Sequence, residues 1–218
     1  MKFAASYSFG KDSALALWRM KCAGHEPVCL ITTVNPEAER SWFHGIDFTL
    51  MDAVSERMGI PLIKCICSGD NYHTEFEKCL RQARQMGAEA CVFGDIDIEG
   101  HLEWNRERCA AADMQCIVPL WQENRESVVY EMIDSKLKAV IKCVQSEFLD
   151  DSFLGTEITR DLIEKIRQTG ADICGENGEY HTFVCGGPLF GSPVDIELGD
   201  ILDFGSHSAI DIRAKSIQ

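Results

Sequence analysis

The first half of the chain alternates short apolar runs with stretches that have the spacing of amphipathic helices, and this alternation limits the possible folds strongly. Five apolar runs are expected to be strands, at residues 2–7, 27–34, 61–67, 90–94 and 116–121. Four helices are expected between them, at residues 13–22, 48–58, 74–86 and 102–113. Strands that are apolar throughout and are separated by helices are typical of a parallel sheet covered on both faces. We therefore predict an α/β fold with a doubly wound five-stranded parallel sheet. If its strand order is 3-2-1-4-5, the turns after the first and fourth strands face one crevice.

After residue 122 the pattern changes to a smaller α+β region. Helices are expected at residues 125–135 and 159–168, and strands at residues 138–144, 179–185, 193–197 and 209–214. We therefore predict two domains, residues 1–122 and residues 123–218, with the second packed over the mouth of the first.

The turn after the first strand, Ser8-Phe9-Gly10-Lys11-Asp12-Ser13, has the composition of a phosphate site. It joins a buried strand to a helix, so backbone N–H groups and the positive end of the helix dipole are available to an anion. Lys11 adds a positive charge, and the two serines add hydroxyl donors. A Walker A loop would need glycine at position 5 and Ser or Thr after the lysine, where the chain has Ala5 and Asp12. On these six residues alone, an ordinary capped turn remains the alternative interpretation.

Composition restricts the partners. The net charge of −14 argues against nucleic acid, because neutralising phosphates requires clustered Lys and Arg. No stretch approaches the length of a membrane span and no signal peptide is evident, so we expect a cytoplasmic protein without a membrane partner. The 11 cysteines have no C-x-x-C or zinc-ligand spacing, and we expect most to be buried and reduced.

A second segment of functional character lies at residues 174–184. Glu176, Asn177, Glu179 and His181 gather there beside glycines that allow tight turns. If the segment from residue 178 is a strand, Glu179 and His181 share one face of it. A hairpin turn followed by a half-polar strand is the alternative interpretation.

Three separated blocks resemble the diphthine–ammonia ligase family, a group of N-type ATP pyrophosphatases (PP-loop enzymes) in the adenine nucleotide alpha-hydrolase-like superfamily. Residues 8–13 resemble the pyrophosphate loop S-G-G-x-D-S, with Phe9 in place of one glycine. Trp104-Asn105-Arg106-Glu107-Arg108, followed by Pro-Leu-Trp at residues 119–121, resembles the central block of the family. Residues 175–182 resemble its C-terminal signature. The resemblance implies a Rossmann-like fold of the HUP type followed by a smaller C-terminal domain.

The resemblance also implies an activity, an ATP-dependent ligase that forms an amide. A substrate carboxylate would attack the α-phosphate of ATP and release pyrophosphate, and ammonia would then displace AMP from the acyl-adenylate. The substrate would be diphthine on elongation factor 2 or an unidentified small carboxylate, and the sequence leaves open whether the chain forms a homodimer. A PP-loop sulfurtransferase of the tRNA thiolation type and a non-catalytic ATP-binding sensor are the alternatives.

With that resemblance, we expect particular residues to bind ATP and Mg²⁺. The loop would hold the pyrophosphate end, backbone groups after the second strand would meet the adenine edge, and the turn after the fourth strand would face the same crevice. The nucleotide-binding candidates are Ser8, Phe9, Gly10, Lys11, Asp12, Ser13, Thr33, Val34, Asn35, Gly94 and Asp95. Asp12 and Asp95 are the candidate Mg²⁺ ligands.

The candidate catalytic residues fall into two groups. Arg106 and Arg108 would steady charge on the α-phosphate or the carboxylate, although one helix can hardly present both to the site. Glu176, Glu179 and His181 would receive ammonium and accept its proton. His44 and His101 are further candidates for the pocket, with a structural role as the alternative.

Overall fold

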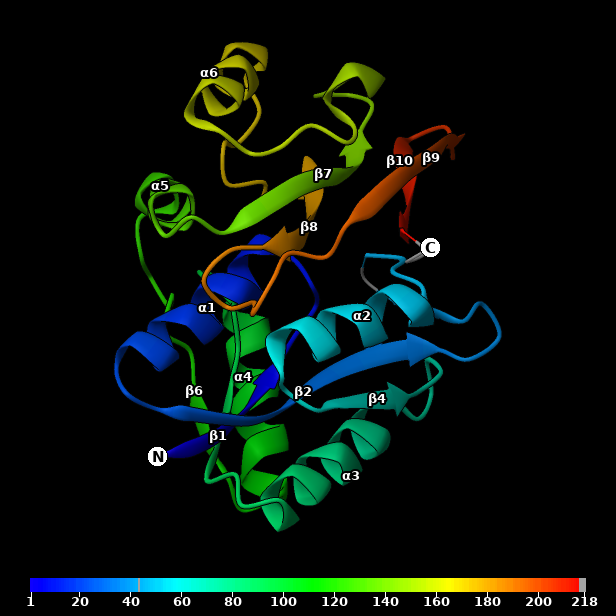
Figure 1. Ribbon diagram of the computed structural model, residues 1–218. Helices are drawn as coiled ribbons and strands as arrows, with labels where there is room; N and C mark the ends of the chain where they lie inside the picture. The colour runs from blue at the N-terminus through cyan, green and yellow to red at the C-terminus, as the bar shows by residue number, and fades with distance from the viewer. Residues whose placement is uncertain (43, 216–218) are drawn as a thin grey trace.

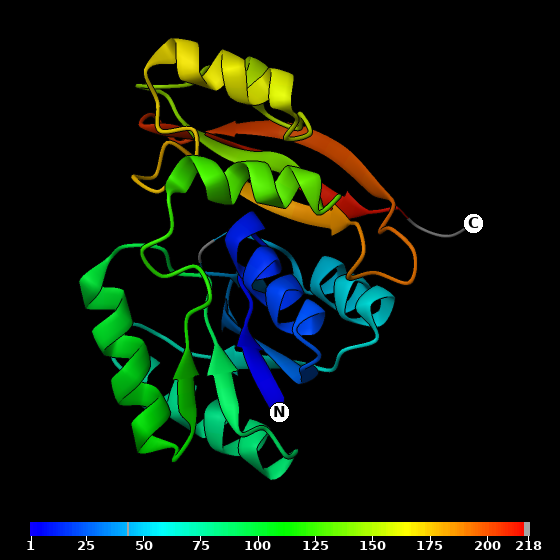
Figure 2. The same cartoon turned by 90° about the vertical axis from the view of Figure 1, so that its left-hand side faces the viewer.

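The structure, a computed structural model, describes residues 1–42 and 44–215. Figures 1 and 2 show two sheets lying one above the other with helices between and outside them. The last residues of the expected second domain, 216–218, lie outside the described residues.

The first sheet confirms the predicted α/β fold. Its parallel strands follow the order β4-β2-β1-β5-β6, so the condition stated above, the order 3-2-1-4-5, is met. These strands are β1 (Lys2–Ser6), β2 (Glu26–Asn35), β4 (Leu62–Ile66), β5 (Ala90–Val92) and β6 (Gln115–Ile117). A two-residue strand that the sequence did not indicate, β3 (Arg40–Ser41), pairs antiparallel with the end of β2.

Helices cover both faces of this sheet, as a doubly wound fold requires. On one face lie α1 (Lys11–Cys22) and α2 (Phe48–Met58), which also touch the second sheet. On the other face lie α3 (Tyr72–Gln85) and α4 (Glu99–Ala111) (Figure 1). Asp47 caps α2 by accepting a hydrogen bond from Leu50 N at 2.8 Å, and Gly59 ends it in the left-handed conformation that favours glycine.

The second sheet is antiparallel, with the order β8-β7-β10-β9. Its strands are β7 (Lys138–Gln145), β8 (Tyr180–Gly186), β9 (Ile196–Asp203) and β10 (His207–Ala214). The helices α5 (Arg125–Asp134) and α6 (Arg160–Thr169) and a 3₁₀ turn (Asp151–Phe153) accompany it. The prediction of a strand at residues 193–197 was wrong, because the strand begins later and is longer. As an edge strand exposed along most of its length, β9 lacks the buried alternation by which a strand is found in sequence.

The two sheets share one hydrophobic core. Buried side chains of the first half, such as Leu15 and Leu50, belong to the same cluster as Ile141 and Phe183 of the second half. Arg19 on α1 adds a paired contact with α5, donating to both carboxylate oxygens of Glu131 at 2.8 and 2.5 Å. The division into domains at residue 122 therefore stays a prediction, because the two halves are packed against each other through a shared core.

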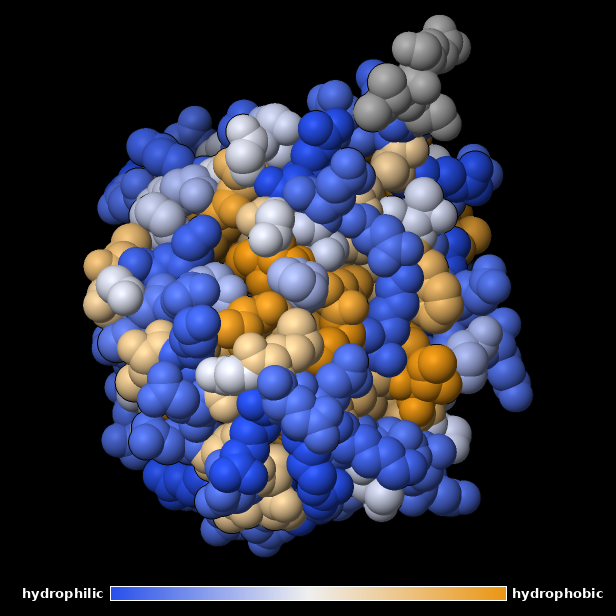
Figure 3. Space-filling model, turned by 60° about the horizontal axis from the view of Figure 1, so that its bottom comes forward, coloured by the Kyte–Doolittle hydropathy of each residue, from blue (hydrophilic) through white to orange (hydrophobic). Residues whose placement is uncertain are grey.

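The surface mixes charged and apolar regions. On the face seen in Figure 3, apolar side chains gather near the middle of the view within a margin of hydrophilic ones. None of the helices in the described ranges combines the length and the apolar character needed to cross a membrane.

Gly94 lies shortly after β5 and directly against the beginning of α1. A Cβ atom there would be 2.6 Å from Ser13 N and 2.7 Å from the carbonyl carbon of Asp12. Both neighbours are backbone atoms, which cannot move aside as the end of a flexible side chain can. The close approach of β5 to the pyrophosphate loop therefore requires glycine at this position.

We expect Gly94→Ala to lower the free energy of unfolding by about 1–3 kcal/mol, because the added methyl group overpacks the contact between β5 and α1. Gly100→Ala is the matched control, since a Cβ at Gly100 meets nothing within 4 Å. That control should be unchanged or stabilised by up to about 1 kcal/mol. Urea denaturation of both variants measures the difference, and equal stability of the two would contradict the close contact.

Candidate active site

A cavity of about 740 Å³ lies beyond the carboxyl ends of β1 and β5. This is the switch point of the sheet, because the chain leaves β1 for α1 on one face and leaves β5 for α4 on the other. The turn after β1, the turn after β5 and the segment around the start of β8 all contribute to its wall. The predicted crevice shared by the two turns is therefore present. The polar lining residues used below are Ser8, Lys11, Asp12, Ser13, His44, Asp95, Asn105, Glu176 and His181.

The pyrophosphate loop forms the floor of the cavity. Gly10 is the N-cap of α1 without a side-chain cap, so the loop is not the ordinary capped turn of the alternative interpretation. Lys11 N donates to Thr182 Oγ1 of β8 at 3.0 Å, and Ser13 Oγ donates to Gly10 O at 3.0 Å. The next two backbone N–H groups, those of Asp12 and Ser13, donate to no residue within the described ranges. They remain available to an anion at the positive end of the helix.

Phe9 contributes its backbone to this loop but not its ring. Its φ of +68° is in the left-handed region, which explains why the resembled loop has glycine at this place. The ring is fully buried and meets the Tyr7 ring edge-on, with the centroids 5.1 Å apart. We expected Phe9 among the nucleotide-binding residues. Its buried side chain is absent from the described cavity lining, so a contact with nucleotide stays a prediction that this position does not favour.

Lys11 and two carboxylates form a charged cluster at the floor of the cavity. Lys11 Nζ donates to both oxygens of Asp12 at 2.8 and 2.7 Å and lies 3.6 Å from Glu176 Oε1. Burial opposes the charge on Lys11, but these acids outweigh it and raise the pKa of the ammonium well above its usual value. Burial also raises the pKa of Glu176 to about 7, against the opposing attraction of Lys11. Glu176 is thereby poised to exchange a proton near neutral pH.

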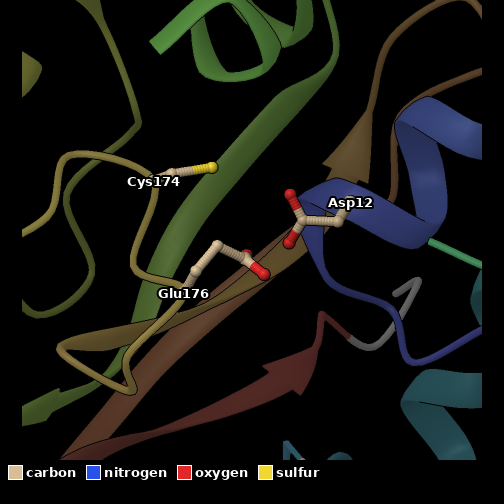
Figure 4. Close-up of side chains that lie close together, drawn as sticks. All are labelled: Asp12, Cys174 and Glu176. Atoms are coloured by element: carbon tan, nitrogen blue, oxygen red, sulfur yellow. The ribbon is translucent and has the colours of Figure 1, made fainter. Parts of the chain in front are cut away.

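Asp12, Cys174 and Glu176 offer one ligand atom each within 4.8 Å of one another. Figure 4 shows the Cys174 and Glu176 side chains reaching from one loop toward the Asp12 carboxylate at the start of α1. Carboxylate oxygens suit Mg²⁺, which fills its other positions with water and phosphate oxygens. Burial raises the pKa of the Cys174 thiol to about 12, so it stays protonated and is a poor ligand. The cluster therefore fits a hard cation on its oxygens.

Asp95, the second predicted Mg²⁺ ligand, lines the cavity apart from this cluster. Its carboxylate accepts a hydrogen bond from Asn105 Nδ2 at 2.7 Å and lies 3.0 Å from His101 Nδ1. Both oxygens thus face side chains of α4. A metal-binding role for Asp95 stays a prediction that its contacts do not favour.

Glu179 and His181, which were expected to share a face, point in different directions. Glu179 precedes β8 and is buried, and its carboxylate accepts hydrogen bonds from Asp172 N, Asn177 N and Asn177 Nδ2 at 3.0–3.1 Å. It therefore closes the loop that carries Glu176, and it is absent from the described lining of the cavity. His181 does line the cavity, so of the two predicted residues it alone is placed to meet a substrate.

His44 and His181 stand together in the cavity wall. Their rings meet edge-on with the centroids 5.1 Å apart. Burial and the neighbouring His181 lower the pKa of His44 to about 3, so His44 is neutral near pH 7. Its Nδ1 atom is buried and has no hydrogen-bond partner within the described residues.

The described cavity lining omits two predicted residues, Arg106 and Arg108, and one predicted range, residues 33–35. Arg106 is exposed, and Arg108 donates to His73 Nδ1 at 2.6 Å and lies 3.4 Å from Glu77, behind the cavity wall. Thr33, Val34 and Asn35 are the end of β2, where backbone atoms pair with β3 and β4. The expected roles of these arginines and of the end of β2 in binding nucleotide therefore lack support from their positions.

Comparison with known proteins identifies the family. The model of the diphthamide synthase N-terminal domain matches residues 1–116, and that of the diphthamide synthase C-terminal domain matches residues 124–216. The chain belongs to the diphthamide synthase family. Among its curated relatives, the diphthine–ammonia ligase of Bos taurus is 28% identical, with 96% of this chain and 86% of that protein covered. The diphthine–ammonia ligase of Homo sapiens is also 28% identical, over 93% of this chain and 85% of its own.

A solved structure described as a predicted subunit of tRNA methyltransferase from Methanocaldococcus jannaschii also aligns with the chain. It covers 86% of this chain and 98% of its own, with a TM-score of 0.48 and 16% identity. A likeness of that size bears on neither fold nor function.

Several residues that line the cavity of this diphthamide synthase family member were not predicted from its sequence. Tyr72, Phe93 and Trp104 form an aromatic wall, in which the Tyr72 and Trp104 ring centroids are 5.3 Å apart. Trp104 and Asn105 stand three and four residues after His101, a spacing that places all three on one face of a helix. That spacing was the available signal for Asn105, whereas Tyr72 and Phe93 come from elements whose meeting only the fold reveals.

We expect Glu179→Gln to lower the free energy of unfolding by about 1–3 kcal/mol, since the buried side chain loses one acceptor oxygen and leaves partly buried donors of the loop unpaired. Glu103→Gln, an exposed change on α4, is the control and should stay within about 0.5 kcal/mol of the parent. Thermal or urea unfolding decides between them. A Glu179→Gln variant as stable as Glu103→Gln would mean that the carboxylate does not hold the loop.

Proposed function

We propose that this chain is an ATP-dependent ligase that joins ammonia to a carboxylate through an acyl-adenylate, with release of AMP and pyrophosphate. One observation carries the proposal: the cavity at the switch point brings an open helix N-terminus and Lys11 against Glu176. Membership of a family whose curated relatives are named diphthine–ammonia ligase supports diphthine as the carboxylate. Elongation factor 2 would then be the protein that carries it.

ATP binds with its pyrophosphate end on the loop. The free N–H groups of Asp12 and Ser13, the Lys11 ammonium and the serine hydroxyls offer donors to phosphate oxygens. The Asp12 carboxylate would hold Mg²⁺, which when bound would neutralise charge on the phosphates. Because Lys11 is bonded to Asp12, the charges at this end are already fixed in place before nucleotide arrives.

The adenine base lies on the aromatic wall. Tyr72, Phe93 and Trp104 line the cavity, whereas the end of β2 does not reach the described lining. Stacking on aromatic side chains is favourable for any base because every base has a π face. This placement replaces the expected adenine contacts at Thr33–Asn35.

Glu176 accepts the proton that ammonium must lose before nitrogen can attack the acyl-adenylate. A base acts best when its pKa lies near the working pH, and burial places the pKa of Glu176 at about 7. Neutral His44 and the neighbouring His181 line the same cavity and offer polar ring atoms to the substrate. The reaction thus uses acids and imidazoles at one end of the cavity and ring faces at the other.

A sulfurtransferase would instead need a reactive thiol beside the loop. Cys174 is the cysteine in the acidic cluster, but it is fully buried and its pKa is raised to about 12, whereas a nucleophilic cysteine needs a lowered pKa. The chemistry of this cysteine therefore favours the ligase. A non-catalytic ATP-binding sensor predicts tight ATP binding without pyrophosphate release.

Incubation with ATP, Mg²⁺, ammonium and an elongation factor that carries diphthine should yield AMP and pyrophosphate, and Lys11→Ala should slow this at least about 100-fold through loss of preorganised charge at the phosphates. Lys21→Ala, in the last turn of α1 and outside the described cavity lining, is the control and should keep full activity. Coupled pyrophosphate release and chromatography of the nucleotides measure both. Formation of ADP and phosphate, or full activity of Lys11→Ala, would contradict the adenylation scheme.

Trp104→Ala should weaken AMP binding by about 1–3 kcal/mol, the usual effect of removing one stacking side chain, and leave pyrophosphate binding unchanged. Trp42→Ala is the matched control, because Trp42 is exposed and lies outside the described cavity lining. Isothermal titration with AMP and with pyrophosphate separates the two ends of the nucleotide. Equal AMP affinity in both variants would remove adenine from the aromatic wall.

A further inference from the structure

The Arg125 guanidinium joins two loops that form separate walls of the cavity. Arg125 Nε and Nη2 donate to the two carboxylate oxygens of Asp97 at 2.7 and 2.9 Å, a paired contact. Arg125 Nη1 donates to Asp172 at 2.5 Å and to the Asn177 side-chain oxygen at 3.2 Å. One side chain at the start of α5 thus fixes segments that are far apart in the sequence.

Each loop held by Arg125 carries residues of the site. Asp97 lies between Ile96 and Ile98, which line the cavity after β5. Asp172 and Asn177 enclose the short stretch that contains Glu176. Arg125 itself is not among the described lining residues, so it acts on the cavity through the loops it holds.

The backbone that carries Arg125 is itself held at two points. Asn124 caps α5 by accepting from Ser127 N at 3.0 Å, which fixes the backbone from which Arg125 extends. Gln122 N donates to Ile96 O at 2.6 Å and ties the same connection to the loop after β5. A guanidinium offers donors in a planar fork that suits two carboxylates at once, which a lysine ammonium does not.

We propose that Arg125 is a positioning residue of the ligase reaction, which holds the Glu176 loop in a fixed place against the turn after β5. This inference rests on the proposed function. Glu179 holds the same loop from inside, through bonds to Asp172 N and Asn177 N, while Arg125 holds its outer side. Glu176 has a 3.6 Å ion pair with Lys11 and depends on these two neighbours for its place.

If Arg125 only stabilised the fold, its loss would destabilise the whole protein, but other contacts hold this region. The helix α5 is also fixed by its Asn124 cap, by the Arg19 pair with Glu131 and by the burial of Val128 and Val129. The Arg125 contacts are partly exposed to solvent, and exposed ion pairs add little to stability. Loss of Arg125 should therefore leave the fold intact and displace only the loops.

The test compares Arg125→Gln, Arg125→Lys and the control Arg160→Gln. The control removes an exposed arginine whose Nη2 donates to both carboxylate oxygens of Asp134. Amide formation by Arg125→Gln should fall about 100-fold, because a small misplacement near the reacting atoms costs that much. ATP–pyrophosphate exchange and the KM for ATP should change less than about threefold, since the phosphate and adenine contacts remain. Arg125→Lys should recover part of the lost rate, and Arg160→Gln should behave as the parent.

Amide hydrogen exchange gives a second measure that does not depend on activity. In Arg125→Gln, exchange should rise at residues 173–178 and stay as in the parent along β1 and α1. Three results would each overturn the proposal. They are hydrogen exchange in this loop as in the parent, a rate of product formation as in the parent, and an equal loss of ATP–pyrophosphate exchange and product formation. If the parent protein makes no AMP with the diphthine-carrying factor, the proposed function fails, and the hydrogen exchange result still decides whether Arg125 positions the loop.

Discussion

The contact between β8 and the pyrophosphate loop is the interaction on which the site depends. Val184 N donates to Phe9 O at 2.8 Å, and Lys11 N donates to Thr182 Oγ1. Together they fix the loop's peptide groups on both sides of Gly10. The left-handed Phe9 is then stable because its carbonyl has a backbone partner and its ring fills the core, which offsets the strain of its φ angle.

A consequence of this contact is that the charged floor of the cavity belongs to neither half of the chain alone. Lys11 and Asp12 come from the start of α1, whereas Cys174 and Glu176 come from the loop before β8. Burial between the two halves raises the pKa of Glu176 to about 7, because the cost of burying its charge exceeds the opposing attraction of Lys11. The fold thereby creates a proton acceptor that an exposed glutamate could not provide near pH 7.

The architecture of the first half was predictable because its signals are local. Apolar runs of strand length, helix spacing between them and glycine at helix ends indicate the number of strands and their alternation with helices. The loop at residues 8–13 was found for the same reason, since a strand, a turn and a helix follow one another directly. The edge strand β9 was misplaced because its exposure leaves no pattern of burial.

Residues of the site were predictable only where one short segment of the sequence carries several of them. The spacing of Glu179 and His181 suggested a shared face, but β8 begins after Glu179, and three donors from its own loop draw that carboxylate inward. Arg125 gave no signal, because its partners Asp97 and Asp172 are distant in sequence and meet only through α5. A catalytic glutamate and a loop-holding glutamate look alike in a sequence, and what separates them is whether neighbouring N–H groups or the cavity occupy the carboxylate oxygens.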